Sequence, residues 1–215
     1  MLMDKEANTV AVIVAHPDDE TLWCGGSILN NPQWRCFIAS LCRKNDPDRA
    51  PKFEKVLKEL DADGAMGDLD DGPGQFPLSD DEVESAIMSL LPSGQFDLIL
   101  THSIYGEYTR HRRHEEIGKA VIRLWHAGKL KTKALWAFAY EDGGRSDLPT
   151  AIKNASLHSV LPAAIWNKKY HIITDLYGFT ANSWEAQSTP TEEAFWQFFN
   201  SGQAYQWLQN GNVIS

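Results

Sequence analysis

A short apolar run that ends in a cluster of charged side chains constrains the fold more than any other stretch of the sequence. The run VAVIVA at residues 10–15 is followed by His16, Pro17, Asp18, Asp19 and Glu20. A run of this length and composition is typical of a strand buried on both faces of a parallel sheet. Pro17 has no amide hydrogen to donate to a neighbouring strand, so it ends the strand. The charged side chains should therefore lie at the strand's carboxyl end, where open α/β sheets bind their ligands.

Strand and helix patterns alternate along the rest of the chain. Hydrophobic periodicity and capping residues predict helices at 19–30, 52–60, 79–91 and 112–126, and further strands at 36–41, 96–101, 134–140 and 170–174. Buried strands that alternate with helices predict an α/β fold, a three-layer Rossmann-like sandwich with a mostly parallel sheet. We find no repeat and no linker, so residues 1–215 are expected to form a single domain.

The C-terminal part of the chain is predicted to end in a helix. Thr189, Pro190 and Glu192 provide an N-cap, a proline at the first helical position and a glutamate at the third. This helix would carry the apolar residues Phe195 and Phe198.

Composition excludes several classes of protein. The 20 Lys and Arg against 29 Asp and Glu give a formal net charge of -9, which disfavours nucleic acid or an anionic membrane as a partner. Three cysteines are too few for a disulfide framework, so we expect reduced thiols and a cytoplasmic location. No signal peptide is expected in the polar residues 1–10, and no run approaches the roughly 20 apolar residues of a membrane span.

The clustered charges after the first strand need a partner, because unpaired buried charge is costly. Imidazole and carboxylate ligands suit Zn²⁺, and a carboxylate left over suits a general base. A second stretch, residues 101–118, places His102 after another strand and His111 and His114 three residues apart, on one face if a helix has begun. Three ligands and an open position for water are typical of a catalytic zinc site.

The two stretches together resemble a known family. The segment AHPDDETLWCGG at 15–26, followed from Thr101 on by TH, GEY and HxxH, is similar to the PIG-L / LmbE-like zinc-dependent N-deacetylases. That family includes de-N-acetylases of N-acetylglucosaminyl-phosphatidylinositol, of mycothiol and bacillithiol precursors, and of some glycopeptide antibiotics. The resemblance covers the N-terminal half of the chain, and the C-terminal part matches poorly.

The resemblance implies a reaction and a role for each matched residue. His16, Asp19 and His114 would hold Zn²⁺ or another divalent metal, and Asp18 would be the general base for the attacking water. His111 would act as general acid or stabilise the oxyanion. The implied enzyme is a metal-dependent amidohydrolase that removes an N-acetyl or small N-acyl group from an amino sugar or its conjugate.

The chain departs from the family in the second motif, which is usually close to GHPDH and here reads RHRRH at 110–114. Arg113 replaces the aspartate that orients the first histidine, so His111 should be less basic and less firmly held. Glu107, Glu115 or Glu116 are the candidates to replace that aspartate.

Four residues are candidates for substrate contact: Arg43, Arg49, Arg113 and His102. Arg43 and Arg49 lie where the family places a substrate-contacting arginine, and Arg113, like Arg112, could pair with a phosphate or carboxylate. His102 could instead be a partner of a metal ligand or a plain loop residue.

Simpler interpretations stand beside these. Asp18 and Asp19 could only cap the first helix, and residues 70–72 are predicted to form a turn. The protein could also be a metal- or sugar-binding protein that has lost its acid machinery at Arg113. A phosphoester hydrolase is disfavoured, since such enzymes often use two metals. A homo-oligomer is possible.

Overall fold

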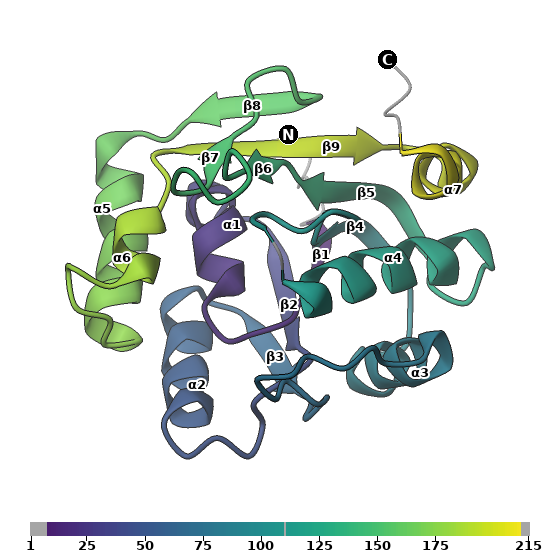
Figure 1. Ribbon diagram of the computed structural model, residues 1–215, viewed down its shortest axis with the longest axis horizontal. Coiled ribbons are helices and arrows are strands. Elements are labelled where there is room, and N and C mark those ends of the chain that lie inside the picture. The colour runs from purple at the N-terminus through teal and green to yellow at the C-terminus, as the bar shows by residue number, and fades with distance from the viewer. Residues whose placement is uncertain (1–7, 110, 212–215) are drawn as a thin grey trace, which may run out of the picture.

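The computed structural model describes residues 8–109 and 111–211, and its centre is a seven-stranded sheet (Figure 1). The strand order is β3-β2-β1-β4-β5-β9-β8, with β1 to β5 parallel, β9 antiparallel to β5, and β8 antiparallel to β9. The strands are β1 Thr9–Val14, β2 Arg35–Ser40, β3 Asp63–Met66, β4 Phe96–Thr101, β5 Thr132–Phe138, β8 Leu157–Val160 and β9 Glu192–Phe198, and a small ribbon pairs β6 Tyr140–Glu141 with β7 Thr150–Ala151.

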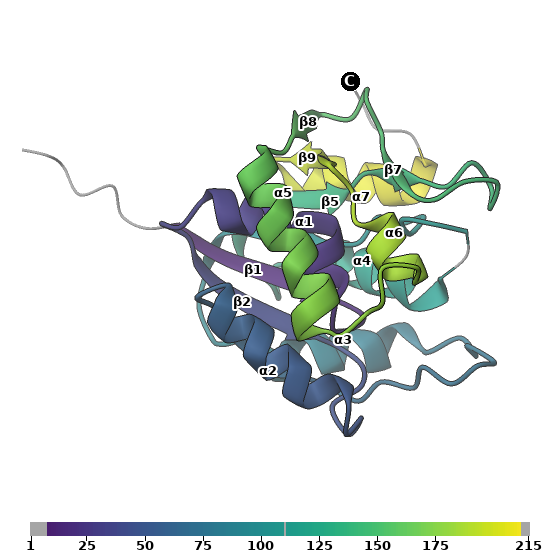
Figure 2. The same ribbon diagram turned by 90° about the vertical axis from the view of Figure 1, so that its left-hand side faces the viewer.

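Helices cover both faces of this sheet. They are α1 Asp19–Asn30, α2 Arg49–Glu59, α3 Asp80–Leu90, α4 Arg112–His126, α5 Ala163–His171 with the π-helical turn η1 Ile172–Leu176, α6 Trp184–Ser188 and α7 Ser201–Asn210. One core cluster joins α1, α2 and η1 to the sheet, and the other joins α3, α4 and α7. The arrangement of the helices around the sheet can be followed in Figure 2. The predicted three-layer, Rossmann-like α/β fold is confirmed. The single domain predicted for residues 1–215 stays a prediction, and residues 1–7, predicted to hold no signal peptide, lie outside the described part.

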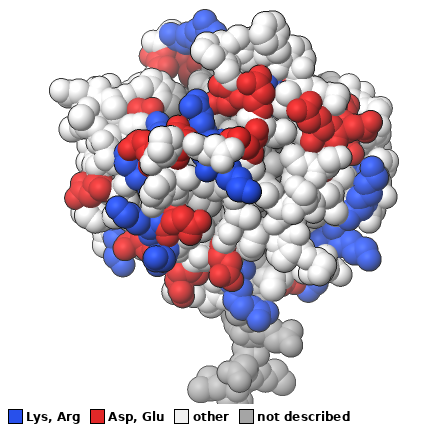
Figure 3. All heavy atoms as spheres, turned by 90° about the horizontal axis from the view of Figure 1, so that it is seen from below, with Lys and Arg blue, Asp and Glu red and all other residues white. Residues whose placement is uncertain are grey.

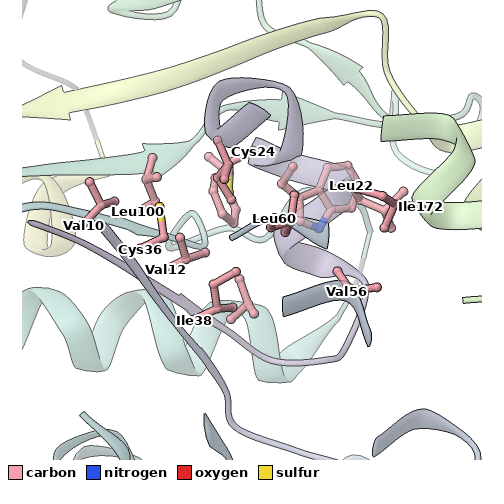
Figure 4. Packing of buried hydrophobic residues seen from close by; sticks show 14 of the residues in the cluster. Val10, Val12, Leu22, Cys24, Cys36, Ile38, Val56, Leu60, Leu100 and Ile172 are labelled. Atoms are coloured by element: carbon pink, nitrogen blue, oxygen red, sulfur yellow. The ribbon is translucent and has the colours of Figure 1, made fainter. Parts of the chain in front are cut away.

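The central strand β1 is buried on both sides, as its composition predicts. Val10, Val12 and Val14 belong to the core under α1 and α2, where Figure 4 shows Val10 and Val12. Ala11 and Ile13 belong to the core under α4. All five side chains are fully buried. Because side chains alternate between the faces of a strand, only an unbroken apolar run satisfies both cores.

The topology sets the position of the site. The strand β1 lies between β2 and β4, and all three are parallel, so their carboxyl ends share one edge. The chain order runs outward from β1 in both directions, which makes the gap between β1 and β4 the point where the strand order reverses. Ligands of open α/β sheets bind at such a point. His16 and His102 follow these two strands directly.

Two predicted elements are wrong in type. Residues 170–174 were predicted as a strand, but they lie in α5 and η1, where the branched Ile172 and Ile173 fill the core beside α1. The last predicted helix is instead the strand β9, which pairs with β5 and β8. Phe195 and Phe198 enter opposite core clusters, so aromatic packing on both sheet faces overrides the capping signal. The boundaries of other elements shift by a few residues; α2, for example, begins at Arg49, with Pro51 in its first turn.

A buried ion pair joins the C-terminal strand to the first helix. Glu193 in β9 accepts hydrogen bonds from Lys169 Nζ at 2.7 Å, from Gly26 N at 2.7 Å and from Ser27 N at 2.7 Å. A Cβ atom at Gly26 would lie 2.5 Å from the Leu161 side chain and 2.9 Å from Glu193 Oε1, so a larger residue would displace both side chains. Both charged side chains are fully buried, and the pair therefore holds α1, α5 and β9 together.

Removal of the lysine should be costly. The Lys169→Met variant leaves the Glu193 carboxylate buried without its cation, and we expect the free energy of unfolding to fall by about 3–5 kcal/mol. Urea denaturation of this variant and of Lys168→Met, an exposed position on the same helix, measures the effect. Equal unfolding midpoints for the two variants would show that the ion pair contributes nothing.

No helix in the described ranges is long and apolar enough to cross a membrane. On the face drawn in Figure 3, acidic and basic side chains are interspersed, and no continuous basic patch is seen there.

Candidate functional site

The fold brings the three predicted metal ligands together from three elements. His16 follows β1, Asp19 opens α1 and His114 lies in the first turn of α4. Asp19 Oδ2 is 3.1 Å from His16 Nδ1 and 3.3 Å from His114 Nε2, and the two imidazole nitrogens are 3.4 Å apart. A carboxylate oxygen and two ring nitrogens therefore form a nearly equilateral triangle.

These distances fit a metal site. Tetrahedral zinc with bonds of about 2.0–2.1 Å holds its ligand atoms roughly 3.4 Å from one another. The side chains of Asp19 and His114 are almost fully buried, and that of His16 is 14% exposed, so one side remains open to solvent. The donor set is therefore suited to a divalent cation with an open position.

A carboxylate lies on the far side of each imidazole. His114 Nδ1 is hydrogen-bonded to Glu107 Oε2 at 2.6 Å, whereas His16 Nε2 lies 3.2 Å from Asp71 Oδ1, an ion-pair distance without hydrogen-bond alignment. A proton held on the far nitrogen by a carboxylate leaves the near nitrogen with a free lone pair, the arrangement common to metal-bound histidines. Asp71 was predicted only as part of a turn, and Glu107 only as a partner for His111.

These two carboxylates give a testable prediction. The Asp71→Asn and Glu107→Gln variants should each weaken metal affinity by about 10–100-fold, because the imidazole loses both orientation and basicity. Competition with a chromophoric chelator measures this affinity. Asp81→Asn, an exposed position at the start of α3, is the matched control. Wild-type affinity in both site variants would rule out the orienting role.

Asp18 lies beside the triangle in an unusual backbone conformation. Its φ is 119°, a value rare for a side chain other than glycine, and it is the residue before α1 but makes no side-chain capping hydrogen bond. Arg49 Nη1 is 2.7 Å from its Oδ2. Burial, and then the charge of Asp19, raise the pKa of Asp18 to about 8, and Arg49 opposes the rise. Strain and a shifted pKa in a cleft favour a catalytic role over simple capping.

His111 completes the group of imidazoles. Its ring stacks on His114 at 4.4 Å and meets His16 edge-on at 4.6 Å. Burial, followed by the neighbouring His114 and His16, lowers the pKa of His111 to about 3, so the ring is neutral. Its partner is the amide of Gln75, 3.1 Å from Nε2, which the sequence did not suggest.

Two of the candidate substrate arginines line the cleft, and each is paired with an acid of the site. Arg43 Nη2 is 2.6 Å from Asp71 Oδ2, and Arg49 binds Asp18 while its guanidinium lies 4.5 Å from the ring centre of Phe179. Each arginine could therefore bind a substrate group only while its guanidinium also remains paired with Asp71 or Asp18.

Arg113 and His102 are buried and do not line the cleft. The Arg113 guanidinium donates to the carbonyls of Asp70 and Phe76 and to Glu116. His102 Nε2 accepts from Ala15 N at 2.9 Å, and its Nδ1 lies 2.8 Å from Glu107. The structure therefore places Arg113 under a loop and His102 behind the three predicted ligands, away from the position expected for substrate contact.

The cleft itself has a volume of about 220 Å³. Its aromatic wall consists of Tyr108 and Trp184, whose rings meet edge-on at 4.7 Å. The remaining lining is mostly charged or polar: His16, Asp18, Asp19, Arg43, Arg49, Asp71, His111 and Glu185, with Pro17 and Leu22. No motif in the sequence marks Trp184, because its helix lies far along the chain from the two motifs.

Comparison of the sequence with known proteins finds one distant relative. No family profile matches the chain. An uncharacterized protein of Acanthamoeba polyphaga mimivirus, L374, is 24% identical over 159 residues, which cover 67% of this chain and 68% of that protein.

Three solved structures illustrate the structural likeness. An N,N'-diacetylchitobiose deacetylase from Pyrococcus horikoshii superposes with a TM-score of 0.66 at 14% identity, over 91% of this chain and 85% of that one. The zinc-inhibited teicoplanin deacetylase Orf2 gives 0.58 at 16%, over 80% and 85%. The 4-carboxy-2-hydroxymuconate hydratase GalB of Pseudomonas putida gives 0.62 at 14%, over 90% and 97%.

The chain therefore has the fold of the PIG-L / LmbE-type deacetylases, as its motifs predict. At such low identity the likeness concerns the fold alone, and the hydratase shows that this fold serves more than one reaction. The function must be argued from the site.

Proposed function

We propose that this protein is a zinc-dependent hydrolase that removes an N-acetyl or other small N-acyl group from an amino sugar or its conjugate. The observation that carries the proposal is the triangle of His16 Nδ1, Asp19 Oδ2 and His114 Nε2, with a carboxylate behind each imidazole. A zinc ion held there would act as a Lewis acid on the amide oxygen and increase the acidity of water.

The side chains around the triangle supply the proton transfers of amide hydrolysis. In its ionised form, which the Arg49 guanidinium stabilises against the rise in pKa, Asp18 takes a proton from the attacking water and returns it to the leaving amine. The neutral His111 donates a hydrogen bond to the oxygen that becomes negative in the transition state. The position of these groups at one end of the sheet supports a role for them on the same amide.

The cleft supports a small, polar substrate. Tyr108 and Trp184 offer an aromatic wall for the apolar face of a sugar ring, and the charged lining offers partners for hydroxyl groups. Two structural neighbours, named for diacetylchitobiose and teicoplanin, favour an acylated amino sugar over other amides.

Acetate release tests the proposal. Purified protein, stripped of metal and reloaded with Zn²⁺, is expected to release acetate from N-acetylglucosamine or diacetylchitobiose, whereas the stripped protein is not. Metal binding without release from any acylated amine would favour the non-catalytic alternative. Equal release with and without metal would remove the proposed mechanism.

A further inference from the structure

The buried side chain of Arg113 holds a loop that contacts the site. Its guanidinium donates to the carbonyl oxygens of Asp70 and Phe76, the two ends of the segment 70–76. It also pairs with Glu116, one turn along α4. A planar guanidinium has five donors in fixed directions, so it can hold three acceptors spread around one plane, whereas the three donors of a lysine all point from a single nitrogen. The loop is therefore tied to the same helix that carries His114.

Between those two anchors, the loop presents two side chains to two imidazoles. Asp71 Oδ1 faces His16 Nε2 at 3.2 Å, and Gln75 Nε2 lies 3.1 Å from His111 Nε2. Gln75 has a φ of 40°, a backbone conformation that the anchored loop maintains. The residue that departs from the family motif thus supports the segment that contacts both histidines.

The orientation of the Gln75 amide is fixed by a second hydrogen bond. Its Oε1 accepts from the backbone N–H of Arg112 at 3.1 Å, so its NH₂ group faces His111. An NH₂ group can only donate, and His111 Nε2 must therefore accept through its lone pair. The neutral ring then carries its proton on Nδ1.

The protonated nitrogen, His111 Nδ1, is buried and has no hydrogen-bond partner among the described residues. His111 lines the cleft, and one nitrogen from each of His16, His111 and His114 lies within 4.8 Å of the others. A buried donor without a partner is costly unless a ligand satisfies it.

We propose that Gln75 and Arg113 are positioning residues for His111: Arg113 anchors the loop, and Gln75 fixes the His111 tautomer with the proton on Nδ1, directed to the substrate oxygen. This rests on the proposed function for its consequence in catalysis, but the tautomer itself is a property of the protein alone. The Gln75–His111 contact takes over the role of the acidic neighbour that Arg113 replaces.

The tautomer is measured by ¹⁵N NMR of histidine-labelled, metal-free protein. We expect His111 to be protonated at Nδ1 in the wild type, to sample both tautomers in Gln75→Ala, and to move its proton to Nε2 in Gln75→Glu, because a carboxylate accepts rather than donates. Gln95→Ala, on an exposed loop, is the control. A wild-type proton on Nε2, or a His111 tautomer unchanged in both Gln75 variants, would overturn the proposal.

Turnover provides a second readout that a purely structural role would not produce. In zinc-loaded protein, Gln75→Ala should lower kcat about 10²-fold with little change in KM or metal affinity, the effect of a misplaced catalytic group. Gln75→Glu should not rescue kcat, although it restores a contact. Wild-type kcat in Gln75→Ala would refute the positioning role. Should the wild type release no acetate at all, the proposed function fails while the NMR experiment still decides the tautomer.

Arg113→Lys extends the test to the anchor. Loss of the planar fork should loosen both Asp71 and Gln75, so this variant is expected to combine mixed His111 tautomers with weaker metal binding. If it does not fold, the Gln75 variants decide the proposal alone. A folded Arg113→Lys with the wild-type tautomer would contradict the anchoring role.

Discussion

Replacement of Asp18 by asparagine is expected to lower kcat by about 10²–10⁴-fold, the contribution typical of a general base. The amide of asparagine cannot accept the proton of the attacking water. Asparagine is chosen over alanine because it is found more often at a positive φ such as the 119° of Asp18, so the substitution disturbs the backbone less. Metal content should remain at the wild-type level, since Asp18 is not one of the three ligand residues. Steady-state acetate release together with metal analysis measures both quantities.

The matched control is Asp61→Asn. Asp61 also has a positive φ, 50°, but is exposed and lies at the end of α2, away from the cleft. The Asp61→Asn variant measures the effect of the same substitution at a positive φ outside the cleft, so any further loss of kcat in Asp18→Asn is due to the missing carboxylate in the site. Full activity in Asp18→Asn would assign the base to another group.

Replacement of His114 by alanine is expected to remove the metal and, with it, all turnover. The proposed site assigns one of its three ligand atoms to His114, so the loss of affinity should exceed the roughly 10–100-fold typical of an outer partner. The change also leaves Glu107 with only His102 as an imidazole partner. Zinc content after dialysis, and affinity by chelator competition, test the expectation.

His126→Ala is the control for that variant, because His126 is exposed at the other end of α4 and stacks on Tyr205. Its metal content should equal that of the wild type. A His114→Ala protein that retains zinc and activity would show that the ligand set is wrong.

The sequence predicts the parallel core of the fold because that core depends on local patterns. The apolar run at 10–15 allows only a buried strand. The periodic spacing of apolar residues at 19–30 and 112–126 allows only helices. The C-terminal part fails for a physical reason. In β9, a good capping sequence precedes aromatic residues that are buried on both sheet faces, and only the position of β5 decides between helix and strand.

The site shows the same division. His16, Asp18, Asp19 and His114 are found from two motifs whose strand ends must meet at one edge. Asp71, Gln75 and Trp184 reach the site from loops and a short helix, and nothing in their local sequence marks them. Arg113 was interpreted as a possible substrate contact, but only the structure shows that its donors are used by the carbonyls of 70 and 76 and by Glu116.

The central claim is that one cation is held by His16, Asp19 and His114. Anomalous diffraction at the zinc edge from a crystal of the zinc-loaded protein tests it most directly. We predict a single strong peak bonded to His16 Nδ1, Asp19 Oδ2 and His114 Nε2. A peak at other side chains, or no peak in this triangle at saturating zinc, would contradict the account.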